Sequence, residues 1–200
     1  MMIRWIESLD EWDGTPPAVL LLSDASRDRR QHVLRNLVAK ALRLGPAVVE
    51  IEQFAGRPPV VTRPLGSGLY LSEVERGRFT AIAVARSPVG VAIEVADFNA
   101  PVTSERLHPI ESAFLQPLAG KEKVLAFARL CSIKDAYSHA RGQGLSPLPS
   151  RLAVQFVDEE RAAISDPTIQ NDRVEAGTIW RGLSDRWAAV SAVTIGRQPS

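Results

Sequence analysis

The chain has 200 residues and a formal net charge of +1, with 45% hydrophobic and 24% charged residues. These values exclude a disordered chain, and they leave no basic field that would attract nucleic acid. Cys131 is the single cysteine, so no disulfide forms within the chain, which favours the cytoplasm. No apolar run is long enough for a bilayer, and the acidic first residues are wrong for a signal peptide. We therefore expect a cytoplasmic protein with neither nucleic acid nor membrane as a partner.

The first 86 residues combine strand-like segments with one helix. Strands are predicted at residues 2–6 and 18–22, followed by a helix to about Leu44 that Ser23 or Asp24 caps. Apolar residues at i, i+3, i+4, i+7 and i+8 from Leu34 give this helix one apolar face. Further strands are predicted at 48–54, 69–71 and 79–85, with residues 73–78 as a connection.

After the break at Ser87-Pro88, the order of elements changes. An apolar strand at 89–95 precedes two helices, at 104–118 and 122–141. Late strands are predicted at 152–157, 162–164, 177–181 and 187–193. This order predicts an α+β fold with an N-terminal lobe of residues 1–86 and a C-terminal lobe of residues 87–200.

Five segments carry a resemblance to a known family, and they occur in the family's order. They are Gly56-Arg57-Pro58, Leu69-Tyr70-Leu71-Ser72-Glu73, Pro88-Val89-Gly90-Val91-Ala92-Ile93-Glu94, Ser132-Ile133-Lys134-Asp135-Ala136 and Gly142-Gln143-Gly144-Leu145-Ser146. Together they resemble the 4'-phosphopantetheinyl transferase superfamily, in its fused two-lobed form. The resemblance implies two pseudo-symmetric lobes, each a small antiparallel sheet packed with helices, in a monomer. It also implies transfer of phosphopantetheine from coenzyme A to a serine of an acyl or peptidyl carrier protein.

The resemblance further implies a Mg²⁺-dependent site, because the family neutralises the pyrophosphate with a metal ion held by carboxylates. The implied metal ligands are Glu94 and Asp135. Catalytic roles fall on Asp135, Lys134 and His139. Residues matched to contacts with coenzyme A are Arg29, Arg30, Arg57, Ser72 and Glu73.

This sequence departs from the family pattern at the same site. Ala92 stands where the family has a metal-binding Asp, and Asp135 is one methylene shorter than the family's Glu. Glu73 replaces a phosphate-contacting His, His139 replaces a Lys, and Cys131 replaces a Trp. These changes remove metal ligands and positive charge from one place.

Three hypotheses follow from these residues. The first is an active transferase, in which Glu73 or Glu111 takes over as a metal ligand. The second is a catalytically silent relative that binds a carrier protein or a CoA-type nucleotide. The third is a scaffold that binds neither nucleotide nor metal. Cys131 lacks a His partner in sequence and is predicted to be a packed core thiol.

Overall fold

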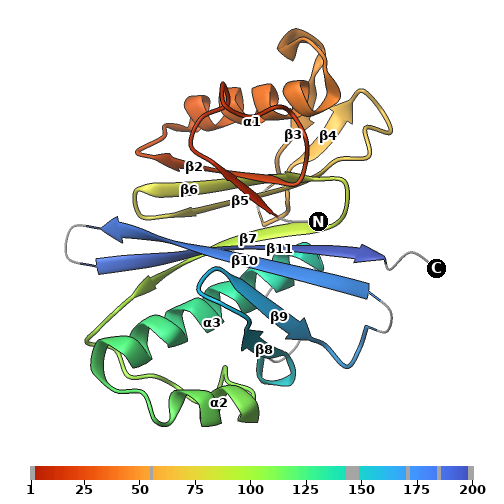
Figure 1. The fold of residues 1–200 in the computed structure, drawn as a ribbon. Coiled ribbons are helices and arrows are strands. Elements are labelled where there is room, and N and C mark those ends of the chain that lie inside the picture. Colours follow the sequence, from red (N-terminus) through yellow and green to blue (C-terminus); the bar gives the residue numbers. More distant parts are fainter. Residues whose placement is uncertain (1–2, 55, 143–148, 170–171, 184–185, 198–200) are drawn as a thin grey trace.

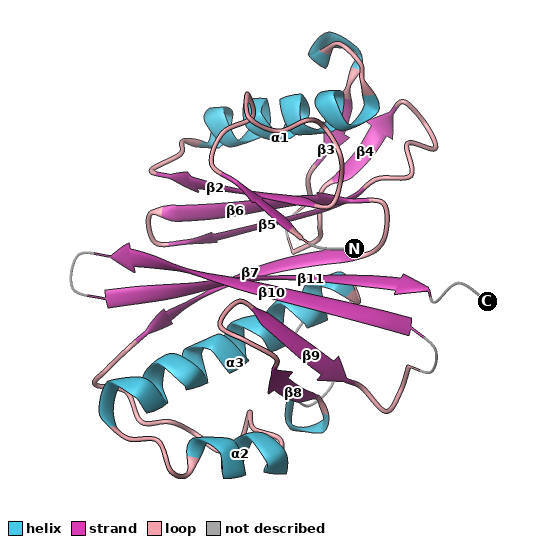
Figure 2. Cartoon of the chain, in the orientation of Figure 1, coloured by secondary structure: helices cyan, strands magenta, loops and turns pink. Residues whose placement is uncertain are grey.

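The computed structural model describes residues 3–54, 56–142, 149–169, 172–183 and 186–197. These described residues form three sheets, three α-helices and two short 3-10 helices. The two larger sheets lie face to face at the centre, with α1 on one outer face and α3 and α2 on the other (Figures 1 and 2). Within the described ranges, no helix has both the length and the apolar character needed to cross a bilayer.

The first sheet has the strand order β1-β2-β6-β5. Its strands are β1 (Arg4–Ile6), β2 (Ala18–Ser23), β5 (Tyr70–Arg76) and β6 (Phe79–Ala85). The prediction of an antiparallel sheet is wrong here, because β1 runs parallel to β2. Parallel neighbours need a crossover, and residues 7–17 supply it. This segment is anchored by the buried Trp12 and by Lys40, whose Nζ donates to the Leu9 carbonyl at 2.6 Å.

Helix α1 (Arg27–Leu42) packs on the first sheet through Leu34, Leu37 and Val38, as the apolar spacing predicted. Its N-cap is Ser26, whose Oγ accepts from the Arg29 N–H. The expected caps, Ser23 and Asp24, are wrong, since Ser23 is the last residue of β2. A 3-10 helix, η1 (Pro46–Val48), leads into a two-stranded sheet of β3 (Glu50–Glu52) and β4 (Val60–Arg63).

Strands β5 and β6 form a tight hairpin. Residues 73–78 were expected to be a connection, but β5 continues to Arg76 and pairs it with Phe79. Gly77 occupies the first loop position with φ 60°. The common two-residue hairpin turns need a positive φ at this position, which glycine adopts readily. The charged residues at the end of β5 hid this strand from a reading based on apolar residues alone.

The second sheet is antiparallel, with the strand order β7-β11-β10-β9-β8. Its strands are β7 (Val89–Ala96), β8 (Ala153–Phe156), β9 (Arg161–Ser165), β10 (Asp172–Leu183) and β11 (Arg186–Arg197). The 3-10 helix η2 (Pro149–Arg151) precedes β8. Helix α2 (Pro109–Leu115) begins later than predicted, because His108 caps it and Pro109 occupies its first turn.

Helix α3 (Gly120–Ala140) lies directly against β7. A Cβ added to Gly90 would lie 2.0 Å from the Ala136 carbonyl oxygen and 2.4 Å from the Ala140 nitrogen. Only glycine therefore permits this approach of helix to strand. Between the two sheets, the core is built largely of small and β-branched residues, among them Ala81, Ala83, Val91, Ala188 and Val190.

The predicted lobe boundary at residue 86 falls between β6 and β7. All strands of the first sheet precede this boundary, and all strands of the second sheet follow it. The division into two lobes at this boundary stays a prediction.

Candidate functional site

Ala92 and Glu94 lie on the face of β7 that packs against α3. Alternation along a strand sends neighbouring side chains to opposite faces. Val91 and Ile93 accordingly join the core between the sheets, while Ala92 joins the core beneath α3. Glu94 is half-buried, and the carboxylate of Asp135 on α3 is near enough to influence its pKa. The structure thus brings together Glu94 and Asp135, the two carboxylates that the resemblance implies as metal ligands.

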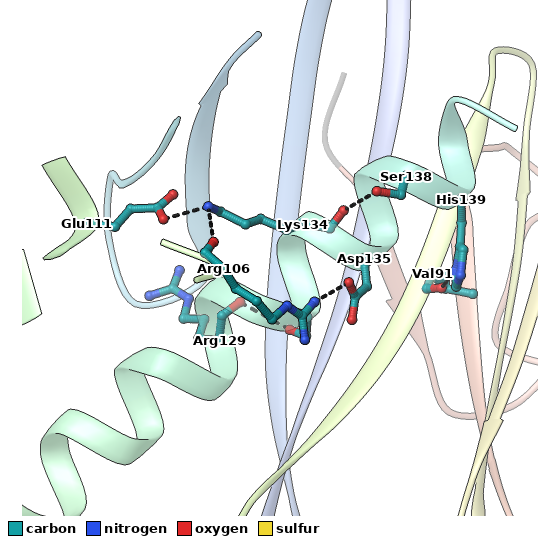
Figure 3. A network of polar contacts seen from close by, with 9 residues as sticks. Val91, Arg106, Glu111, Arg129, Lys134, Asp135, Ser138 and His139 are labelled. Carbon is teal, nitrogen blue, oxygen red and sulfur yellow. Dashed lines mark hydrogen bonds and ion pairs between the residues drawn. The ribbon is translucent and has the colours of Figure 1, made fainter. Parts of the chain in front are cut away.

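A guanidinium already engages one of these carboxylates. Arg106, from the segment between β7 and α2, donates from Nη2 to Oδ1 of Asp135 (Figure 3). Burial opposes the charge of Arg106, but the Asp135 hydrogen bond and the nearby Glu94 carboxylate raise its pKa. Nothing local in the sequence marks Arg106 as part of a site, because it is a loop arginine whose partner lies 29 residues later.

A second arginine, Arg76 of the first sheet, acts on Glu94 through its charge. Burial raises the pKa of Glu94, while the positive charge of Arg76 at the end of β5 opposes that rise. Asp135 adds to the rise and Arg106 opposes it. We call these four residues, Glu94, Asp135, Arg76 and Arg106, the junction cluster, since β5 and β7 belong to different sheets.

Lys134 lies beside Asp135 in sequence but in a different environment. Its side chain is 2% exposed and forms an ion pair with Glu111, with 2.6 Å between Nζ and Oε2. Burial lowers the pKa of Lys134, and the Glu111 carboxylate opposes that change. Nζ also donates to the Arg106 carbonyl at 2.8 Å. These contacts hold α2 and the segment before it onto α3 (Figure 3). The catalytic role implied for Lys134 stays a prediction.

Glu111 is enclosed by donors. Besides Lys134, its carboxylate accepts from the backbone N–H of His108 and that of Val154, each at 2.8 Å. A carboxylate fully buried among these partners is not available to a metal ion. The hypothesis that Glu111 replaces the lost metal ligand is therefore wrong.

His139 and Ser72 meet at the same residue of β7. Val91 turns its N–H and carbonyl away from β11, as every second residue of an antiparallel strand does. Its N–H donates to Oγ of the buried Ser72 at 3.1 Å, and its carbonyl lies 2.7 Å from Nδ1 of His139. Because a carbonyl oxygen only accepts, Nδ1 is the donor. Both side chains complete the free edge of β7. The contact with coenzyme A implied for Ser72 and the catalytic role implied for His139 stay predictions.

The remaining predicted residues lie on the α1 side of the first sheet. Glu73 accepts from Gln53 at 2.6 Å and pairs with Nε of Arg30 at 3.4 Å. Burial raises the pKa of Glu73, and the Arg30 charge opposes that rise. Arg29 is exposed on the first turn of α1, and Arg57 is exposed in the turn before β4. The structure therefore joins Glu73 to Arg30 but leaves Arg29 and Arg57 as separate surface cations.

The residues present do not fit a Mg²⁺ site. Mg²⁺ demands near-octahedral oxygen ligation, yet Ala92 has no ligand atom and Asp135 is engaged by Arg106. Within the described part of the chain, no three His, Cys, Asp or Glu side chains are grouped to hold a metal ion. The hypothesis that Glu73 joins Glu94 and Asp135 around one cation is wrong, since Glu73 faces α1.

Cys131 lies in α3 close to the junction cluster. The residue is 2% exposed, and burial raises the pKa of its thiol to about 12. The thiolate is the reactive form of cysteine, so this residue is the packed core thiol that was predicted.

A groove among the described residues lies elsewhere. It has a volume of about 840 Å³ between β1 and the strands β9 and β10, with Trp5, Glu160 and Gly177 in its wall. None of the four residues of the junction cluster lines it. The candidate site is thus defined by its charged side chains and by its position where β7, α3 and the end of β5 adjoin, and not by this groove.

Comparisons with known proteins show a likeness in structure and none in sequence. Neither a protein-family model nor a curated protein matches the sequence. Among solved structures, the chain is similar to a holo-(acyl-carrier-protein) synthase from Bacillus anthracis str. Ames in complex with CoA (3',5'-ADP), with 18% identity and a TM-score of 0.43. The match covers 54% of this chain and 96% of that one. The resemblance is thus distant and extends over about half of the chain.

Proposed function

We propose that this chain is a phosphopantetheinyl transferase-like protein that binds a CoA-type nucleotide at the junction cluster and docks a carrier protein beside it. The observation that carries the proposal is the pairing of Arg106 with Asp135 beside β7, where the end of β5 with Arg76 adjoins and its charge acts on Glu94. Two guanidinium groups at one place suit phosphate oxygens, which arginine binds through paired N–H groups.

The proposal gives the chain binding without metal-dependent transfer. Phosphoryl transfer depends on positioning and on neutralisation of the developing charge. Ala92 supplies no ligand, and Asp135 is paired with Arg106. With those two positions lost, the site lacks the carboxylate ligands that metal-dependent transfer needs.

A second candidate function is transfer to a carrier-protein serine. The observation in its favour is that Glu94 on β7 and Asp135 on α3 share one site, as the sequence resemblance implies. In that version, Asp135 takes the proton from the incoming hydroxyl, and it must first leave Arg106.

Calorimetric titration of coenzyme A tests the first proposal. We expect binding to the wild-type protein and weaker binding to Arg76→Ala. The matched control is Arg78→Ala, which removes a neighbouring arginine that pairs with Asp24 on the exposed surface. No heat of binding in Mg²⁺ or in EDTA contradicts nucleotide binding and favours a scaffold.

Mass spectrometry separates the two candidates. The protein is incubated with coenzyme A and purified apo acyl and peptidyl carrier proteins, with Mg²⁺ and then with Mn²⁺. The first proposal predicts no phosphopantetheine added to any carrier protein. An added mass on a carrier-protein serine contradicts it and establishes the transferase.

A further inference from the structure

The junction cluster balances its own charge. Glu94 and Asp135 contribute two carboxylates, and Arg76 and Arg106 contribute two guanidinium groups. Two half-buried carboxylates that lie close together repel each other and ordinarily need a cation between them. Here side chains of the chain itself meet that need.

Arg106 is held in place at both of its ends. Its carbonyl accepts from Lys134, whose amine is fixed in turn by the buried Glu111. Its guanidinium donates to Asp135, which follows Lys134 in α3. Leu107 beside it is buried, and the Leu107 N–H donates to the Ser104 carbonyl at 3.0 Å. A cation anchored in this way is preorganised, so little entropy is lost when it binds an anion.

The guanidinium retains capacity for a ligand. Arginine has five N–H donors, and among the described residues Asp135 is the one side chain to which Arg106 donates. The Arg106 side chain is 31% exposed, so its remaining N–H groups are within reach of solvent.

We infer that Arg106 is the resident cation of this site: it takes the place of a divalent metal ion beside Glu94 and Asp135, so phosphate groups bind here without Mg²⁺. The phosphate-binding half of the inference rests on the proposed function, whereas the displacement of the metal does not. The ligand class is a phosphorylated nucleotide whose charge is neutralised by guanidinium groups.

The first experiment needs no nucleotide. Mn²⁺ is titrated into the wild-type protein, Arg106→Ala and Arg106→Gln, and free Mn²⁺ is followed by electron paramagnetic resonance. We expect Mn²⁺ to bind both variants at least about tenfold more tightly than the wild type, because two uncompensated carboxylates remain. Adding Asp135→Asn to Arg106→Ala must abolish the gain. The control Arg78→Ala, whose circular dichroism is compared with that of the other variants, must behave like the wild type.

Two outcomes of the Mn²⁺ titration overturn the inference. One is a wild-type protein that binds Mn²⁺ as tightly as the variants. The other is a pair of folded variants with no gain in affinity. If Arg106→Ala fails to fold, Arg106→Gln, which keeps a donor toward Asp135, still decides between these results.

The second experiment uses coenzyme A as the probe, by calorimetry in EDTA and in Mg²⁺. We expect the wild-type affinity to be the same within about twofold in both buffers, and to fall at least about tenfold in Arg106→Ala, as the loss of a charge-assisted hydrogen bond implies. Binding that requires Mg²⁺ overturns the inference about Arg106 and leaves the proposed function standing. Absence of binding in both buffers contradicts the proposed function, while the Mn²⁺ titration still decides the role of Arg106.

Discussion

Lys134 and Asp135, which are consecutive in α3, hold opposite ends of the same residue. Nζ of Lys134 donates to the Arg106 carbonyl at 2.8 Å, while the Asp135 carboxylate accepts from the Arg106 guanidinium. Consecutive helical residues project about 100° apart, so one turns toward the buried side and the other toward the junction cluster. A loop arginine is thereby fixed to a helix by two neighbouring side chains.

The buried ion pair predicts a large loss of stability when it is broken. Lys134→Met removes the partner of Glu111 and leaves a carboxylate buried without its cation. We expect the free energy of unfolding to fall by about 3–5 kcal/mol, measured by urea denaturation. In the double variant Lys134→Met/Glu111→Gln, part of this loss should return, because no uncompensated charge remains. A loss below about 1 kcal/mol in the single variant contradicts the assigned role.

The close approach of α3 to β7 predicts that Gly90 tolerates no side chain. In Gly90→Ala, the new methyl group meets backbone atoms of Ala136 and Ala140, which cannot rotate away. We expect a loss of at least about 3 kcal/mol in the free energy of unfolding. Gly182→Ala is the matched control, because a Cβ there meets no atom within 4 Å. Equal unfolding midpoints for the two variants would contradict the packing described.

The contact of Ser72 with Val91 predicts a coupling between the two sheets. Ser72→Ala leaves the Val91 N–H buried without an acceptor. We expect this variant to lose about 1–3 kcal/mol of stability by chemical denaturation. Ser138→Ala is the control, since Ser138 Oγ donates to a carbonyl of its own helix, and its loss should stay within about 0.5 kcal/mol. Faster amide exchange at Val91 in Ser72→Ala would locate the effect in β7.

The environment of Glu94 predicts a pH-dependent contribution to stability. Burial raises the pKa of Glu94 above 4.5, so the folded state holds more protons than the unfolded state between 4.5 and the folded pKa. The contribution of Glu94 to stability is therefore fully present below pH 4.5 and is lost as pH rises through the folded pKa. Glu94→Gln removes this dependence, so its stability relative to the wild type should improve with rising pH. Unfolding curves at a series of pH values measure this, and a constant difference between the two proteins would refute it.

Several elements were predictable because their signals are local. Residues 89–95 are apolar enough to define β7, and the spacing from Leu34 identified the buried face of α1. Alternation also predicted that Ala92 and Glu94 share a face of β7. Strand β5 was predicted too short, because its charged end is stabilised by Arg30, a partner from α1 that periodicity does not register.

The site was predictable only in part. The sequence by itself determined that Glu94 lies on a strand and Asp135 on a helix, and that Ala92 supplies no metal ligand. The tertiary structure alone decided which cations meet these carboxylates, since Arg76 and Arg106 come from a hairpin and a loop. The physical reason is range: strand alternation and helical spacing are set within a few residues, whereas an ion pair forms only after sheet and helix packing has brought distant segments together.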